Sequence, residues 1–168
     1  MLKLVKKTLY QIRKEQPEII PILSSLTMGI GGMMQGELLA KDLSIKTQRD
    51  TRIFIAYDQK NKIVGWTFMF PGLLNKEGKQ FRHRAYFFTD PSKRKMGIGS
   101  FLMESMLKWI KRNQRELYVF PWDERSRNFF SKWKNNKFVR TSLESIWENI
   151  DSREMETVQL YKNKRKKK

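Results

Sequence analysis

Alternating and helical patterns of apolar residues divide most of the chain into strands and helices. The clearest pattern lies in residues 52–71, where two strands rich in Ile, Val, Phe and Trp flank the polar turn Asp58–Lys62. This arrangement predicts a β-hairpin. Apolar residues also recur at helical spacing over residues 98–111 and cover more than one face, which predicts a heavily buried helix. Further strands are expected at residues 2–5, 81–89, 116–122, 139–150 and 155–162.

Other segments give weaker patterns. Residues 10–26 are apolar at helical intervals but contain Pro17 and Pro21, so they predict either one broken helix or two short ones. A short helix with Phe129, Phe130 and Trp133 turned inward is expected within residues 126–136. The remaining expectations are a glycine- and methionine-rich loop at 28–36, a helix at 37–43 and a polar loop at 73–80.

The charge of the chain is strongly positive. The 168 residues carry a formal net charge of +18. Residues 162–168 hold six basic residues, so the other 161 still carry +12, and the six are too dense to fold and are expected to form a basic flexible tail. Such a surface attracts nucleic acid, acidic proteins or phosphorylated ligands, and solubility is the alternative reason for it.

Composition excludes several classes of chemistry. The chain has no cysteine, which rules out disulfides, thiolate catalysis and zinc held by cysteine, and its single histidine argues against a multi-histidine metal site. We therefore expect no metal. No apolar run is long enough to span a bilayer, and no signal peptide is recognised at the basic N-terminus. We expect a cytoplasmic protein whose single domain covers residues 1–161, because no repeat or linker divides the chain.

The segment TDPSKRKMGIGSFLMESMLKWI, residues 89–110, suggests an anion site. It places Gly97 and Gly99 between the basic run Lys93–Lys95 and the predicted helix, directly after a predicted strand. The first backbone N–H groups of a helix have no partner within the helix, and the helix dipole favours an anion beside them. Glycine lets a phosphate approach this backbone. The alternative is a tight strand-to-helix turn with incidental lysines.

The same segment resembles motif A of the GNAT superfamily of acyl-CoA N-acyltransferases, which reads R/Q-x-x-G-x-G/A. The motif matches Arg94-Lys95-Met96-Gly97-Ile98-Gly99. A later family pattern, L-x-V-x-x-x-N-x-x-A, aligns with Leu117, Val119, Asp123 and Ser126 at the same spacing. The hairpin with Gly65 looks like the second and third strands of the family, so that the resemblance covers residues 52–138.

The resemblance implies a fold and a cofactor. The fold would be an α/β (α+β) domain with a mixed, mainly antiparallel twisted sheet and helices on both faces. The cofactor would be acetyl-CoA, with its pyrophosphate on the backbone N–H groups of residues 94–99 and its pantetheine amides along the end of the strand at residues 87–89. The residues expected to bind it are Phe87, Phe88, Thr89, Arg94, Lys95, Met96, Gly97, Ile98, Gly99, Ser100, Asp123 and Ser126.

Two catalytic groups follow from this resemblance. His83 stands eleven positions before Arg94, the spacing of the carboxylate base in the histone-acetyltransferase branch, and could accept the proton of an amine. The alternative is a half-exposed strand histidine with no task. The backbone N–H near Phe88 could bind the developing oxyanion. Phe130 occupies the position where the family usually has a general-acid Tyr; Tyr118, Tyr86, Ser126 or a water could substitute.

The predicted function is therefore acetyl transfer from acetyl-CoA to an amine of an unidentified acceptor. The basic surface favours an acidic acceptor, or an amine on a molecule bound to nucleic acid. The alternative is a GNAT-fold binding module, catalytically weak or inactive, which engages nucleic acid or an acidic protein through its basic surface. Phe130 and the basic tail favour the module, and the glycine motif favours the enzyme.

Overall fold

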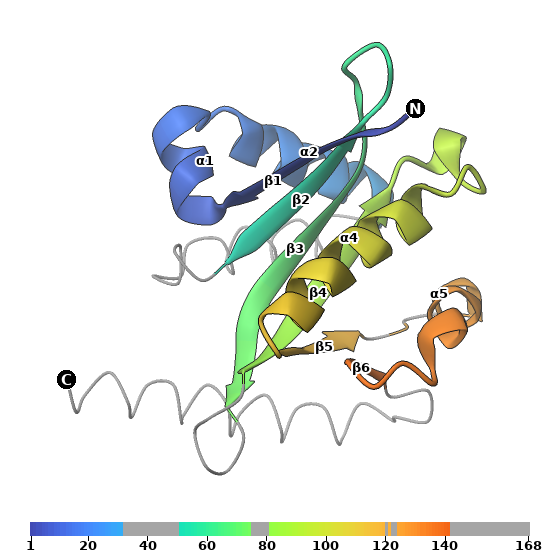
Figure 1. Ribbon diagram of the computed structural model, residues 1–168. Coiled ribbons are helices and arrows are strands. Elements are labelled where there is room, and N and C mark those ends of the chain that lie inside the picture. Colours follow the sequence, from blue (N-terminus) through green and yellow to red (C-terminus); the bar gives the residue numbers. More distant parts are fainter. Residues whose placement is uncertain (32–50, 75–80, 120, 122–123, 142–168) are drawn as a thin grey trace, which may run out of the picture. The chain divides into compact units, whose positions relative to one another are not determined.

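The computed structural model describes residues 1–31, 51–74, 81–119, 121 and 124–141 (Figure 1). The predicted helix at 37–43, the predicted strand at 155–162 and the basic tail at 162–168 lie outside these residues. So do most of the loops predicted at 28–36 and 73–80.

A six-stranded sheet in the order β1-β2-β3-β4-β5-β6 forms the framework of the fold. The β1–β2 and β2–β3 pairs are antiparallel, and the β4–β5 and β5–β6 pairs are parallel. The predicted fold class, a mixed and mainly antiparallel sheet with helices, is confirmed. The strands are β1 (Lys3–Thr8), β2 (Arg52–Tyr57), β3 (Ile63–Leu74), β4 (Phe81–Thr89), β5 (Glu116–Val119) and β6 (Val139–Thr141).

The chain divides into two compact units. The first unit comprises residues 1–70 and 86–106, and the second unit comprises residues 71–85 and the residues from 107 onward. The strands β3 and β4 and the helix α4 (Ile98–Arg112) contribute residues to both units. The single domain predicted for residues 1–161 stays a prediction.

In the first unit, α1 (Leu9–Glu15) and α2 (Ile19–Gly31) pack on one face of the sheet. The Thr8 side chain accepts a hydrogen bond from the Gln11 backbone, and the Gln11 side chain returns one to Thr8, so α1 begins with a capping box. This confirms the two-helix alternative for residues 10–26. The shared core consists of Leu9, Ile12, Ile19, Leu23, Ile53, Ile55, Trp66, Phe68 and Phe70.

The predicted loop at residues 28–36 is wrong for its first four residues, because α2 continues to Gly31. The buried Thr27 hydroxyl donates to the Leu23 carbonyl at 2.7 Å and accepts from the Trp66 indole N–H at 3.1 Å. This contact with the core fixes the helix at the residue just before the glycine-rich sequence. Tertiary packing has here overridden the weak helix propensity of glycine.

The helix α4 covers the opposite face of the sheet in the first unit. Its side chains Ile98, Leu102, Met103 and Met106 are buried, and the Thr67 hydroxyl lies 3.2 Å from the Met106 sulfur. The helix predicted at residues 98–111 is confirmed and runs one residue further.

Gly65 on β3 lets α4 approach the sheet closely. A Cβ atom at this position would lie 2.6 Å from the Ile98 Cγ2 and 3.3 Å from the Phe88 carbonyl oxygen. We expect Gly65→Ala to lower the free energy of unfolding by about 1–3 kcal/mol, because the β-branched Ile98 cannot turn its methyl away freely. Gly29→Ala is the matched control: Gly29 is exposed and no atom lies within 4 Å of its added Cβ, so the substitution should stabilise α2 by about 0.5–1 kcal/mol. Thermal unfolding of both variants tests the contact, and equal stability changes would contradict it.

The second unit joins β5 and β6 to the beginning of β4. His83 pairs with Leu117, and Leu117 pairs with Val139, in two parallel ladders. The strand predicted at 116–122 ends at Val119, and of the strand predicted at 139–150 the structure describes Val139–Thr141. The helix predicted at 126–136 is α5 (Glu124–Phe130) followed by a 3₁₀ turn, η2 (Ser131–Trp133).

The aromatic residues of α5 and η2 form a cluster in the second unit. The Phe129 ring lies edge-on to Phe130 and to Trp133, with centroids 5.0 and 5.1 Å away. Phe130 is buried, whereas Phe129 and Trp133 are partly buried. The predicted inward direction is thus confirmed fully for Phe130 alone.

Candidate functional site

The connection between β4 and α4 is an ordered turn in the first unit. Asp90 follows β4, and its backbone N–H donates to the Val64 carbonyl of β3 at 2.9 Å. Its carboxylate accepts hydrogen bonds from the Ser92 backbone N–H at 2.9 Å and from the Ser92 hydroxyl at 2.8 Å. These bonds begin a 3₁₀ turn, η1 (Pro91–Lys93), with Asp90 as its N-cap. The turn holds the following basic residues at a fixed place after the sheet.

The hydrogen bonds from Ser92 lower the pKa of Asp90, and the charges of Lys62 and Lys93 lower it further. A lowered pKa in the folded state means that the carboxylate stabilises the fold above its ordinary pKa and loses this effect as the pH falls through the lowered value. We expect a carboxyl ¹³C NMR titration to find Asp90 ionising below the ordinary value of about 3.9. Ser92→Ala should move the pKa back toward that value, because it removes the largest cause. An Asp90 that titrates at or above 3.9 would contradict this account of the turn.

Positive backbone φ angles mark the segment after η1. Lys95 has a φ of 66° and Gly97 a φ of 78°. A residue other than glycine is strained at a positive φ. Successive residues that alternate between right-handed and left-handed helical conformation point their N–H groups into one concavity, which can bind an anion. A Cβ at Gly97 would meet no atom within 4 Å, so the backbone there borders open space.

The helix α4 begins directly at this open space. Its first bond of the i, i−4 type to this loop runs from the Phe101 N–H to the Gly97 carbonyl at 2.9 Å. The N–H groups of Ile98, Gly99 and Ser100 precede that bond, so helix geometry gives them no intrahelical acceptor. The Ile98 side chain is buried beside Gly65 and anchors this end of the helix. Backbone donors therefore stand at the start of a helix whose position is fixed by packing.

The electrostatics of the helix start favour an anion. Lys93, Arg94 and Lys95 lead into it, and Arg94 and Lys95 are exposed. The first turn of α4 contains no acidic residue. The carboxylate that precedes this basic run, Asp90, is engaged by Ser92. The structure thus brings together the sequence-predicted residues Arg94, Lys95, Met96, Gly97, Ile98, Gly99 and Ser100 on one turn, with Met96 65% exposed.

The end of β4 belongs to the same unit as this turn. The Phe88 ring stacks on Trp66 with centroids 5.6 Å apart, and Tyr86 lies edge-on to Phe70 at 5.7 Å. These side chains are partly buried and pack against the core. Phe87 and Thr89 are partly buried. The predicted residues 87–89 therefore lead directly into the predicted anion site.

The other predicted residues belong to the second unit or fall outside the described residues. His83 belongs to the second unit, is 4% exposed and lies edge-on to Trp109, with ring centroids 5.1 Å apart. The half-exposed alternative for this histidine is therefore wrong. Ser126 is partly buried on α5, and Phe130 ends the same helix. Asp123 lies outside the described residues.

Two residues of this site have structural roles that the sequence analysis does not predict. Asp90 organises the turn, and the Asp-Pro dipeptide at the end of a strand is a recognisable signal for such an N-cap. Gly65 seats the start of α4. No local pattern could reveal this contact, because Gly65 and Ile98 are distant in sequence.

Across the described ranges, no helix combines the length and apolar character needed to cross a bilayer. The same residues contain no cluster of three or more His, Cys, Asp or Glu side chains able to hold a metal ion.

Solved structures share the fold. An aminoglycoside acetyltransferase from an uncultured soil metagenomic sample is 19% identical, with a TM-score of 0.56, over 81% of this chain and 87% of its own. Ribosomal-protein-alanine N-acetyltransferase from Brucella melitensis biovar Abortus 2308 is 14% identical, with a TM-score of 0.52, over 79% and 90%. Glucosamine-6-phosphate N-acetyltransferase from Arabidopsis thaliana is 14% identical, with a TM-score of 0.53, over 88% and 99%.

Comparison at the level of sequence gives one family and no individual relative. No curated protein matches the chain. The family model that matches is that of the acetyltransferase (GNAT) family, and it covers residues 23–134. These residues include β2, β3, β4, the turn at Asp90–Gly97 and the whole of α4. The chain belongs to the GNAT acetyltransferase family.

Proposed function

We propose that the protein transfers an acetyl group from acetyl-CoA to an amine. The observation that carries this proposal is the start of α4, where backbone donors, the positive φ angles of Lys95 and Gly97 and the exposed Arg94 converge. The doubly charged pyrophosphate of acetyl-CoA fits this place, because both the N–H groups and the helix dipole favour an anion. Membership of the family supports the same choice of donor.

The remaining contacts to acetyl-CoA are assigned from the motif positions. The pyrophosphate would accept hydrogen bonds from the backbone of residues 94–100, and the pantetheine amides would pair with the backbone of Phe87–Thr89. Asp123 and Ser126 complete the proposed set through their alignment with the family pattern. The described ladder between β4 and β5 covers Arg82–Arg84 on β4.

The transfer itself requires a base, an oxyanion donor and an acid. The acceptor amine attacks the thioester carbonyl, a C–N bond forms, the C–S bond breaks, and the amine loses a proton to a base. The proposed base is His83. The Phe88 backbone N–H would donate to the oxygen that gains negative charge. Phe130 has no proton to give, so the departing thiolate would take its proton from water or from a hydroxyl such as that of Tyr86, Tyr118 or Ser126.

The acceptor class can be tested with a panel of amines. The structural neighbours are named for acetylation of aminoglycosides, a ribosomal protein's alanine and glucosamine 6-phosphate. The strong positive charge of this chain favours the acidic members of such a panel. We expect the protein to act in the cytoplasm, together with acetyl-CoA. Release of free CoA thiol should exceed the rate of acetyl-CoA hydrolysis with at least one amine, and mass spectrometry should find that amine acetylated. Acetyl-CoA binding without transfer to any of these amines would favour the binding-module alternative.

A further inference from the structure

The second unit carries most of the net positive charge among the described residues. Residues 107–119 and 124–141 hold ten Lys or Arg but only two acidic residues, Glu116 and Glu124. The Glu116 carboxylate already lies 3.6 Å from the Arg140 guanidinium. In the first unit, residues 1–31, 51–70 and 86–106 hold eleven basic and five acidic residues. This excess of basic over acidic residues on the second unit suits a negatively charged binding partner.

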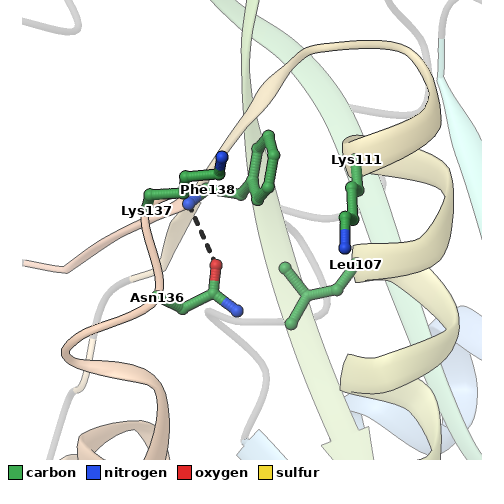
Figure 2. Close-up of a pocket in the computed structure, with 5 residues that line it drawn as sticks. All are labelled: Leu107, Lys111, Asn136, Lys137 and Phe138. Carbon is green, nitrogen blue, oxygen red and sulfur yellow. Dashed lines mark hydrogen bonds between the residues drawn. The ribbon is translucent and has the colours of Figure 1, made fainter.

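A surface pocket of about 280 Å³ lies within this charged unit (Figure 2). Its lining combines two exposed lysines with an apolar floor and one amide: Leu107, Lys111, Asn136, Lys137 and Phe138. No acidic residue lines it. This volume is slightly below the range of roughly 300–1,000 Å³ that is usual for small-molecule sites. It fits one segment of a longer chain that passes over the surface.

The backbone and side-chain bonds of the pocket hold it in place. The Phe138 N–H donates to the Asn136 Oδ1 at 2.9 Å, the dashed line in Figure 2. The Phe138 carbonyl accepts from the Leu117 N–H at 2.8 Å, which ties the pocket to β5. Because the Asn136 oxygen is engaged by Phe138, the amide is oriented and its Nδ2 group is available as a donor toward the pocket. An oriented donor above an apolar floor is suited to recognising a polar edge on a flat ring.

The cations stand on both sides of this floor. The Lys137 ammonium lies 5.1 Å from the centre of the Phe138 ring, and Lys111 projects from α4 on the other side (Figure 2). Single strands of nucleic acid are bound by basic residues along the backbone and aromatic rings against which the bases stack. An acidic polypeptide would use the two charges but would gain little from the aromatic ring. Lysine binds phosphate as a point charge.

We propose that this pocket binds single-stranded nucleic acid. Lys111 and Lys137 each contact a phosphate, one base lies against Phe138 and Leu107, and the Asn136 amide donates to the edge of that base. The interaction is distinct from acetyl transfer, because the pocket contains none of the residues proposed to bind acetyl-CoA or to take part in the transfer. Binding at this pocket would also give part of the positive charge of the chain a role.

The test uses the full chain freed of nucleic acid and a fluorescein-labelled oligouridine of about 12 nucleotides, within the usual span of such sites. Fluorescence anisotropy would be measured from roughly 50 to 200 mM salt. The double variant Lys111→Glu/Lys137→Glu should bind at least about tenfold more weakly at the lowest salt. The logarithmic salt slope should become shallower by about 1.4, since each phosphate contact on a single strand contributes about 0.7.

Matched variants separate the pocket from net charge and from folding. Lys3→Glu/Lys6→Glu makes the same change of charge on two exposed lysines of β1 and should affect the slope much less. Phe138→Leu keeps an apolar side chain but removes the aromatic face, and should weaken binding by about fivefold or more. Acetyl-CoA binding by all three variants should equal that of the wild type, which also confirms that they fold.

Three results would overturn the proposal. Equal loss in the two double variants would show that net charge alone attracts the strand. Polyglutamate that binds as tightly as oligouridine, with no effect of Phe138→Leu, would assign the pocket to an acidic polypeptide. Absence of binding to oligouridine at the lowest salt would leave the charge with no nucleic-acid role.

Discussion

Gly99→Glu should abolish acetyl-CoA binding without unfolding the protein. The substitution places a carboxylate at the second residue of α4, where the proposed pyrophosphate accepts its hydrogen bonds, so repulsion and bulk both oppose the ligand. A carboxylate near a helix N-terminus is itself favourable by about 0.3–1 kcal/mol, so the variant should be at least as stable as the wild type without ligand. Loss of binding could then not be attributed to loss of structure.

Thermal unfolding with and without acetyl-CoA measures this effect. At about 100 times its dissociation constant the ligand should stabilise the wild type by about 2.7 kcal/mol and Gly99→Glu by almost nothing. Gly99→Ala is the matched control, because it improves helix propensity and adds only a methyl group, which the family motif accepts. Equal ligand stabilisation of Gly99→Glu and wild type would place the pyrophosphate elsewhere.

Replacing His83 should reduce turnover by roughly 10²–10⁴-fold if it is the base. Acetyl-CoA affinity should change little. His83→Gln is the decisive variant because it keeps much of the volume and polarity but cannot serve as a base. Its turnover should fall as far as that of His83→Ala in a coupled thiol-release assay.

The burial of His83 suggests a packing role as the alternative to the role of base, and the same variants distinguish the two roles. The ring is 4% exposed and packs edge-on to Trp109, so His83→Ala also leaves a cavity. For other large buried side chains such a cavity costs about 2–5 kcal/mol of unfolding free energy. A His83→Gln variant with wild-type turnover, together with a destabilised His83→Ala, would make the histidine a packing residue of the second unit.

Local patterns in the sequence predicted most of the elements that frame the site. The hairpin of β2 and β3 was evident because two apolar strands enclose Asp58, whose carboxylate accepts from the backbone of Lys60 and Lys62. The strand at 81–89 matches β4 at both ends, and the helix at 98–111 matches α4 to within one residue. Each of these segments is specified by its own periodicity and by turn residues at its ends.

What the sequence could not supply depends on contacts between distant residues. The extension of α2 through Gly31 follows from the bond between Thr27 and Trp66, which no local propensity expresses. The burial of His83 follows from its edge-on packing with Trp109. Strand alternation predicts which residues share a face but not which side chain of a helix covers them.

Calorimetric titration of the purified protein with acetyl-CoA tests most directly whether the start of α4 holds the pyrophosphate, as we propose. Wild-type protein stripped of nucleic acid should bind one acetyl-CoA per chain, and Gly99→Ala should do the same. The Gly99→Glu titration should release no heat beyond dilution. Absence of binding to the wild type, or the same affinity for wild type and Gly99→Glu, would contradict the account.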